Sequence, residues 1–235
     1  MTEKPPPAEG GPDEAMLEEL LSRLQGGEFA RWIDLASAVL LAVAVVASAF
    51  SAWQATLWGG VQATSYAEAS SKRLQSNAAV TTALTQISYD ATSFALGAVE
   101  YFEGNQEAVE FFEERLFREE FRPALEAWLA TEPLQDPEAP KTPFELPEYK
   151  NANLEESQRL TEEAEAKFEE GKEANKNGDD YILATVLFAS VLFFAGVTTK
   201  FKSPRVRALS LFIATAALAV GMTWLVSLPR LDVFF

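Results

Sequence analysis

Residues 37–53 read SAVLLAVAVVASAFSAW, an apolar run that contains no charged side chain. With its flanks it forms a segment, residues 30–58, that exceeds the roughly 20 residues needed to cross a bilayer. Trp32, Trp53 and Trp58 fit the aromatic anchors that gather at membrane interfaces. We therefore interpret residues 30–58 as a first transmembrane helix.

Two further apolar runs lie near the C-terminus, at residues 181–201 and 206–228. Asp179 and Asp180 precede the first of these runs and predict its N-cap, whereas Pro229 follows the second and cannot continue a helix. The chain has 235 residues, of which 48% are hydrophobic, and the apolar residues are concentrated in these three blocks. This distribution predicts an all-α integral membrane protein with three transmembrane helices.

Four cations fill the short link between the last two runs: Lys200, Lys202, Arg205 and Arg207. The positive-inside rule places such a link in the cytoplasm. It follows that the N-terminus is inside and residues 59–180 are outside, with the four cations as interface anchors. Two alternatives stay open: the inverted orientation, and cleavage of a signal peptide after residues 47–49, which read ASA.

The formal net charge of −16 belongs to one part of the chain. Residues 100–180 hold 24 acids and 9 bases, whereas residues 181–235 hold 1 acid and 5 bases. We therefore interpret residues 59–180 as an acidic helical extramembrane domain. Such a surface repels phosphate groups, so we expect no nucleic-acid partner.

The N-terminal residues divide into two parts. Residues 1–12 are rich in proline and glycine and are expected to be disordered. In residues 13–27 leucines recur on one helical face up to Gly26-Gly27, which predicts a short amphipathic helix ending there.

A heptad seam follows the first apolar run. Its positions alternate in spacing between four and three residues, which is typical of a helix packed against another helix. They are Val80, Leu84, Ile87, Ala91, Phe94, Ala98 and Tyr101. The partner helix can belong to the same chain or to a second subunit, and the pattern does not distinguish these alternatives.

The rest of the acidic domain predicts two more helical regions around a proline-rich connector. Apolar residues between 109 and 129 indicate a helix that restarts near Pro123, and residues 153–175 predict a Glu-rich helix with a thin apolar stripe. Five prolines mark residues 132–148 as an extended connector, because proline interrupts helices. The predicted domain is a helical hairpin or small bundle.

Chemistry-bearing residues are scarce. The chain has no cysteine and no histidine, which excludes thiolate nucleophiles and thiolate or imidazole metal ligands. No phosphate-binding glycine loop or nucleophile elbow occurs. The acids of residues 175–180 fall after the glycine, so a turn is favoured there over a calcium loop. We expect a non-enzymatic protein with no cofactor and no metal.

Several short motifs resemble those of a family of uncharacterised bacterial membrane proteins. They are WQATLWGG at residues 53–60, Gln62-Ala63, FRPA at residues 121–124 and Asp180-Tyr181. The layout over residues 30–230 also resembles that of a domain-of-unknown-function family with one span, a helical insert and two closing spans. The resemblance implies a bacterial inner-membrane location and carries no activity.

The sequence favours a membrane scaffold or accessory subunit that acts through helix–helix association. Small residues recur at four-residue spacing in the apolar runs, as in Ala38 and Ala42 or Ala217 and Gly221, which suits close helix packing. The expected partners are membrane lipid and either further copies of the chain or another membrane protein. The alternative hypothesis is a homo-oligomeric ion channel or sensor-gated pore, since such a pore needs no charge within its spans.

Overall fold

The computed structural model describes residues 12–232, and it describes side chains at residue 27 and from residue 30 to residue 232. Within these residues the chain is helical and contains no strand. In chain order the elements are α1 (Pro12–Glu103), α2 (Gln106–Phe111), the π-helical turn η1 (Phe112–Leu116), α3 (Arg122–Leu129), the 3-10 turn η2 (Pro143–Glu145), α4 (Ala152–Thr198) and α5 (Pro204–Ser227). The predicted disordered N-terminus and the side chains of residues 13–26 lie outside the described residues.

Two helices are longer than the sequence indicates, and two predicted boundaries are wrong. Helix α1 continues through Gly26-Gly27, and α4 continues through Gly178 and the expected N-cap at Asp179 and Asp180. A glycine costs a helix only about 1 kcal/mol, and extending a formed helix requires no second nucleation. At Gly178 a Cβ atom would lie 3.7 Å from both the Ala55 carbonyl oxygen and the Trp58 side chain, which is ordinary van der Waals contact.

The chain divides into two compact units. The hairpin unit comprises residues 63–171, and the three-helix unit comprises residues up to 62 and from 172 onward. Three helical segments are long and apolar enough to cross a membrane by length and composition: Ala30–Glu103, Ala152–Thr198 and Pro204–Ser227.

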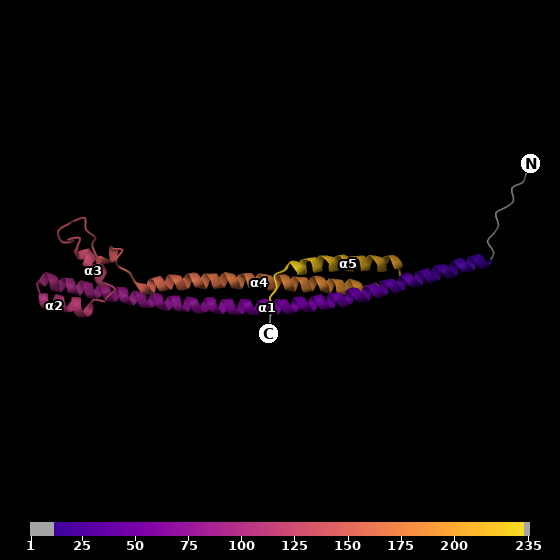
Figure 1. Ribbon diagram of the computed structural model, residues 1–235, viewed down its shortest axis with the longest axis horizontal. Coiled ribbons are helices and arrows are strands. Elements are labelled where there is room, and N and C mark those ends of the chain that lie inside the picture. Colours follow the sequence, from indigo (N-terminus) through magenta and orange to yellow (C-terminus); the bar gives the residue numbers. More distant parts are fainter. Residues whose placement is uncertain (1–11, 233–235) are drawn as a thin grey trace, which may run out of the picture. The chain divides into compact units, whose positions relative to one another are not determined.

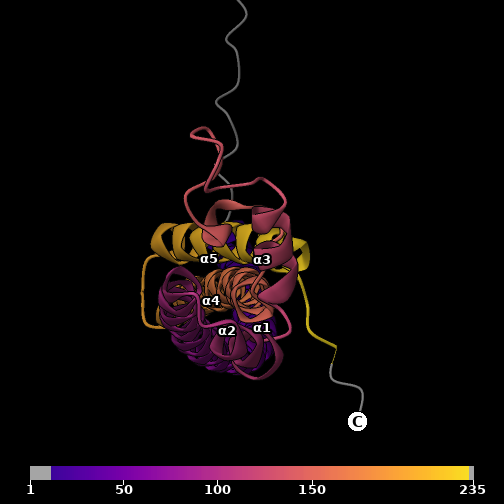
Figure 2. The same ribbon diagram turned by 90° about the vertical axis from the view of Figure 1, so that its left-hand side faces the viewer.

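In the hairpin unit, α1 and the first part of α4 pair in opposite directions (Figure 1). Lys72 pairs with Glu163, the Ser76 hydroxyl donates to the Ser157 carbonyl at 2.9 Å, and both Asn151 and Asn153 donate to Gln86. The residue number thus falls on α4 as it rises on α1. Helices α2 and α3 and the loops between them gather where α1 ends, and Figure 2 looks onto them from that end.

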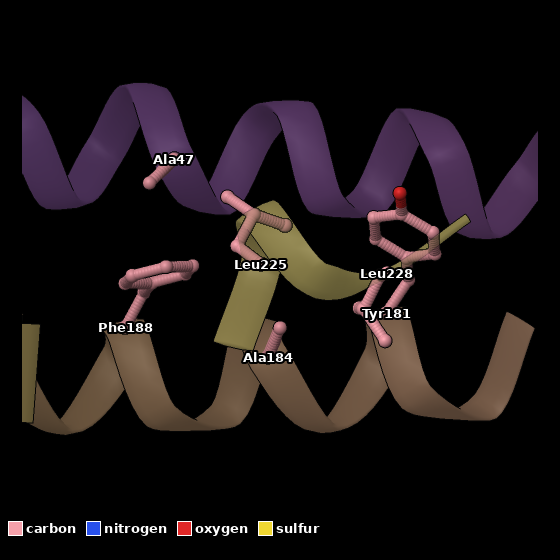
Figure 3. Packing of buried hydrophobic residues seen from close by; sticks show 6 residues of the cluster. All are labelled: Ala47, Tyr181, Ala184, Phe188, Leu225 and Leu228. Carbon is pink, nitrogen blue, oxygen red and sulfur yellow. The ribbon is translucent and has the colours of Figure 1, made fainter. Parts of the chain in front are cut away.

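In the three-helix unit, α1, α4 and α5 share an apolar core. One cluster joins Ala47 of α1, three residues of α4 and two residues at the end of α5, as Figure 3 shows; its members are Ala47, Tyr181, Ala184, Phe188, Leu225 and Leu228. A second cluster joins Leu40 and Ala44 to Val191, Ala195 and Ala214. Buried small residues on α1, such as Ala44, Ala47 and Ser51, let the helices approach closely. The pair Ala38 and Ala42, which the sequence indicated, is exposed instead.

Polar groups fix both ends of the three-helix unit. The buried Gln54 side chain exchanges two hydrogen bonds with the backbone of Leu231, at 3.1 and 3.0 Å. The Trp58 indole and the Tyr181 hydroxyl both donate to the Pro229 carbonyl. At the other end Arg207 pairs with Asp34. The hydrogen bonds from Gln54, Trp58 and Tyr181 therefore hold the segment after α5 against α1 and α4.

Candidate interaction surface

The inner face of α1 in the hairpin unit is built from small and polar residues. Every seventh position is buried, namely Ala69, Ser76, Ala83, Asp90 and Gly97. Short side chains at this spacing allow close approach of the helix that packs against them. The hydroxyl of Ser76 lies 2.9 Å from that of Thr161 as well as bonding to Ser157, so polar contacts fix the register of the hairpin.

Asp90 is fully buried in the hairpin unit. Arg118 binds its two carboxylate oxygens in a fork, with distances of 2.9 and 3.1 Å, and the Tyr149 hydroxyl donates to Oδ2 at 3.0 Å. The hydrogen bond to Asp90 raises the pKa of the Arg118 guanidinium. Burial, together with the bond to Asp90, raises the pKa of Tyr149 above its ordinary value. One carboxylate thus ties the α1 helix to two distant segments of the chain.

Aromatic rings pack beside this ion pair. Phe117, Phe121 and Leu125 form the buried cluster, and Phe144 stacks on Phe121 with ring centroids 5.3 Å apart. Arg122-Pro123 opens α3, and proline is favoured in a first helical turn because it has no N–H to leave unpaired. The restart that the sequence predicts near Pro123 is therefore confirmed.

The opposite face of α1 carries a second heptad pattern, and this pattern is exposed. We call it the outer seam: Leu74, Ala78, Thr81, Thr85, Ser88, Thr92, Ala95, Val99 and Phe102. Its spacing alternates between four and three residues, and all nine side chains are exposed. Leu74 is 68% exposed, Val99 52% and Phe102 71%. A heptad row of small and apolar side chains without a partner is a surface suited to another helix.

The threonine hydroxyl groups of the outer seam donate hydrogen bonds to backbone carbonyls of their own helix. Thr81, Thr85 and Thr92 each donate to the carbonyl four residues earlier, at 2.9, 2.9 and 2.8 Å. Because these donors are already paired, the threonines do not need water as a hydrogen-bond acceptor. The seam is therefore less polar than its composition indicates.

Charge is missing from this region of the helix. Residues 74–99 contain one charged side chain, Asp90, and it is buried on the inner face. Fifteen residues of this described stretch are exposed, and none of them is charged. In a chain with 23% charged residues, such a stretch indicates a surface that avoids charge.

The structure places the predicted seam at the edge of the inner face. None of its seven residues is buried: Val80, Ile87, Phe94 and Ala98 are half-buried, whereas Leu84, Ala91 and Tyr101 are exposed. The seam is therefore only partly used within the chain, with Phe94 packed against the cluster of Phe117, Phe121 and Leu125, and whether its exposed residues meet a second subunit stays a prediction. The predicted seam followed the large apolar residues, whereas the packed positions hold small and polar residues one place earlier, such as Ala83 and Asp90.

The remaining predicted residues are dispersed over the three-helix unit. Trp32 and Trp53 are 69% and 47% exposed, and Lys200, Lys202 and Arg205 are exposed. Arg207 is paired with Asp34, and Trp58 with Pro229. The described residues contain no group of three or more acidic side chains arranged to hold a metal ion.

Sequence reasoning missed the outer seam, although the signal was present. The scarcity of charged residues between 74 and 99 can be counted in the sequence. Which of these residues are exposed becomes known only when the segments that pack against α1 are known. Comparison with protein-family models, with curated proteins and with solved structures finds no match to this chain.

Proposed function

We propose that this chain is a multi-pass protein of the bacterial inner membrane and a non-enzymatic scaffold that pairs with a second copy through the outer seam. The observation that carries the proposal is the exposed, uncharged heptad pattern of residues 74–102.

Membrane insertion is supported by the exposed apolar surface of the three-helix unit. In the most apolar windows of its three helices, only 28%, 33% and 17% of residues are buried. Val46, Phe212 and Val226 are all more than 60% exposed. Such surface is costly in water and favourable in hydrocarbon.

The orientation follows from charge. Lys200, Lys202 and Arg205 remain exposed in the link between α4 and α5, where the positive-inside rule puts them in the cytoplasm. The hairpin unit then lies on the outer side. Asp34 pairs with Arg207, which follows this link, and the pair offsets the charge of Asp34 at the membrane edge.

A second copy fits the outer seam better than a partner of unlike surface. The chain carries a net charge of −16, so two copies repel each other wherever acidic faces meet. The outer seam is a long face on which two hairpin units can approach without opposing carboxylates. A basic partner would instead be drawn to the glutamates of α4.

Membrane anchoring sets the geometry of this pair. Both copies enter the hairpin unit at the same residue of α1, so their seams run parallel and in register. Each seam residue then faces its own copy: Ser88 meets Ser88, and Ala95 meets Ala95. This is the self-complementary contact expected of a two-fold pair.

The test is the subunit count of the full-length protein in native-lipid particles, measured by native mass spectrometry. We expect two copies, and we expect Ser88→Glu to give one copy, because it places a carboxylate on each side of the two-fold contact. Gln158→Glu on the exposed face of α4 is the matched control and should leave two copies. A single copy of the unaltered protein contradicts the proposal, and a closed ring of four or more favours the pore alternative.

A further inference from the structure

An aromatic pocket of about 250 Å³ lies at the end of the hairpin unit. Its wall combines the end of α1, the α2–η1 turn, α3 and the loop after α3. The rings of Phe94, Phe112, Phe117 and Trp128 contribute to it, together with Leu129. The volume is just below the roughly 300–1,000 Å³ of drug-sized ligand sites, so the pocket fits a compact molecule.

Two local features of the backbone shape the wall. In η1 the Phe117 N–H donates to the Phe112 carbonyl at 2.8 Å, five residues back, which brings these two rings onto one side of the turn. Gly97 lies under them, and a Cβ atom there would be 3.1 Å from the edge of Phe117. π-Helical turns of this kind are found frequently at functional sites.

The rim contains a strained residue. Glu132 has a φ of +50°, in the left-handed region that side chains other than glycine rarely adopt. Its carbonyl accepts from Gln135 at 2.8 Å, and its N–H donates to Leu129 at 3.1 Å, so the turn is held in place. Strain of this type concentrates at ligand clamps.

The charge of the lining selects the ligand. Glu113 and Glu132 are exposed residues of the pocket, and none of its lining residues, all within the described chain, is basic. The Trp128 indole N–H already donates to the Pro140 carbonyl at 2.7 Å, so the ring contributes its apolar surface rather than a hydrogen-bond donor. Aromatic faces attract cations, and organic ammonium groups are the usual ligands of aromatic cages.

We propose that this pocket binds a small organic cation with an aromatic or otherwise apolar body. The body lies among the rings, and the positive charge lies near Glu113 and Glu132. An organic anion of the same size is rejected, because it would meet two carboxylates and no compensating cation. The pocket shares Phe102 with the outer seam, and the test below reads ligand binding rather than the number of copies.

The test compares three probes that share one ring and differ in charge: 2-phenylethylammonium, 2-phenylethanol and 3-phenylpropionate. The protein is the full chain in nanodiscs of neutral lipid, with Trp32, Trp53, Trp58 and Trp224 replaced by phenylalanine, so that emission comes from Trp128. We expect the cation to bind at least about tenfold more tightly than the alcohol, and the anion not to bind measurably.

Two variants separate the charge from the cavity. The double change Glu113→Gln and Glu132→Gln should reduce cation affinity about tenfold and leave the alcohol unaffected, whereas Glu110→Gln, outside the lining, should change neither. Ala98→Phe places a ring in the cavity and should abolish binding of both. Equal affinity for cation and anion, insensitivity to the double change, or absence of binding by all three probes would overturn the proposal.

Discussion

The two long helices of the hairpin unit, α1 and α4, differ in the charge of their exposed faces. Over residues 74–99, α1 exposes fifteen side chains and none is charged; over residues 152–171, α4 exposes eleven and six are charged. Their inner faces both hold small and polar residues, with Ser76 against Ser157, and that of α4 also buries Leu160. We propose that the pairing of two copies through the outer face of α1 accounts for this difference.

The largest expected effect comes from the inner face, at Asp90. The change Asp90→Asn keeps the shape of the side chain but removes the carboxylate that binds Arg118 in a fork. Arg118 is only 17% exposed, so it is left without this partner in a mostly buried place. Breaking a buried pair costs about 3–5 kcal/mol, so the free energy of unfolding of the hairpin unit should fall by that order. Hydrogen exchange of the α1 and α3 amides measures it.

The matched control is Glu120→Gln. Glu120 also pairs with Arg118, at 3.3 Å, but it is 58% exposed and should contribute little because solvent screens it. If Glu120→Gln destabilised the hairpin unit as much as Asp90→Asn, the central role of the buried pair would be wrong.

The next effect belongs to the outer seam. Ser88→Glu should weaken the association of two copies at least about tenfold, since opposed like charges are unfavourable. Because Ser88 is exposed, the stability of the hairpin unit should not change. Dilution series of labelled protein in lipid particles measure the first quantity, and hydrogen exchange measures the second. If Ser88→Glu lowered the stability of the hairpin unit as well as the association of two copies, Ser88 would support the fold of its own chain.

A smaller effect is expected at alkaline pH. The pKa of Tyr149 is raised in the folded chain, so its contribution is complete below the pKa of about 10 of an unfolded tyrosine and is lost as the pH rises toward the folded value. The hairpin unit should therefore lose stability above about pH 10. Tyr149→Phe should reduce this loss, measured by hydrogen exchange of the α1 amides across that pH range. An identical pH profile for the variant would contradict the role of Tyr149.

The smallest effect is that of salt on association. Raising ionic strength from 0.1 to 1 M shortens the screening length from about 10 Å to about 3 Å. Repulsion between two acidic hairpin units then weakens, so pairing through an uncharged seam should strengthen by a few-fold. Weaker pairing at high salt would instead indicate that ion pairs join the two copies.

Sequence reasoning predicted the elements better than their faces. Periodicity and composition gave the helical class, the three apolar segments and the restart at Pro123, because these depend on local residue patterns. The continuity of α4 through Gly178 was not predicted, because the glycine indicated a helix boundary, whereas extending a formed helix through one glycine costs only about 1 kcal/mol.

Sequence reasoning predicted a heptad surface on α1 but not the residues that form the outer seam. A heptad pattern on this stretch of α1 was expected, but of the large residues that marked it Leu84 is 59% exposed, whereas Phe94 packs against the cluster of Phe117, Phe121 and Leu125. The chain buries Asp90 instead, because Arg118, 28 residues later, returns to pair with it. A contact over that distance leaves no periodic signal in the sequence. The aromatic pocket depends on the turn η1 and was not predicted at all.

Cross-linking of single cysteines tests the central claim most directly, because the chain has no cysteine of its own. Ala95 of the outer seam and Ala166 of α4 are both exposed alanines of the hairpin unit. Under mild oxidation in native membranes, Ala95→Cys should form a disulfide-linked pair of identical chains, and Ala166→Cys should remain a single chain. Equal cross-linking at both positions, or none at Ala95→Cys, would contradict pairing through the outer seam.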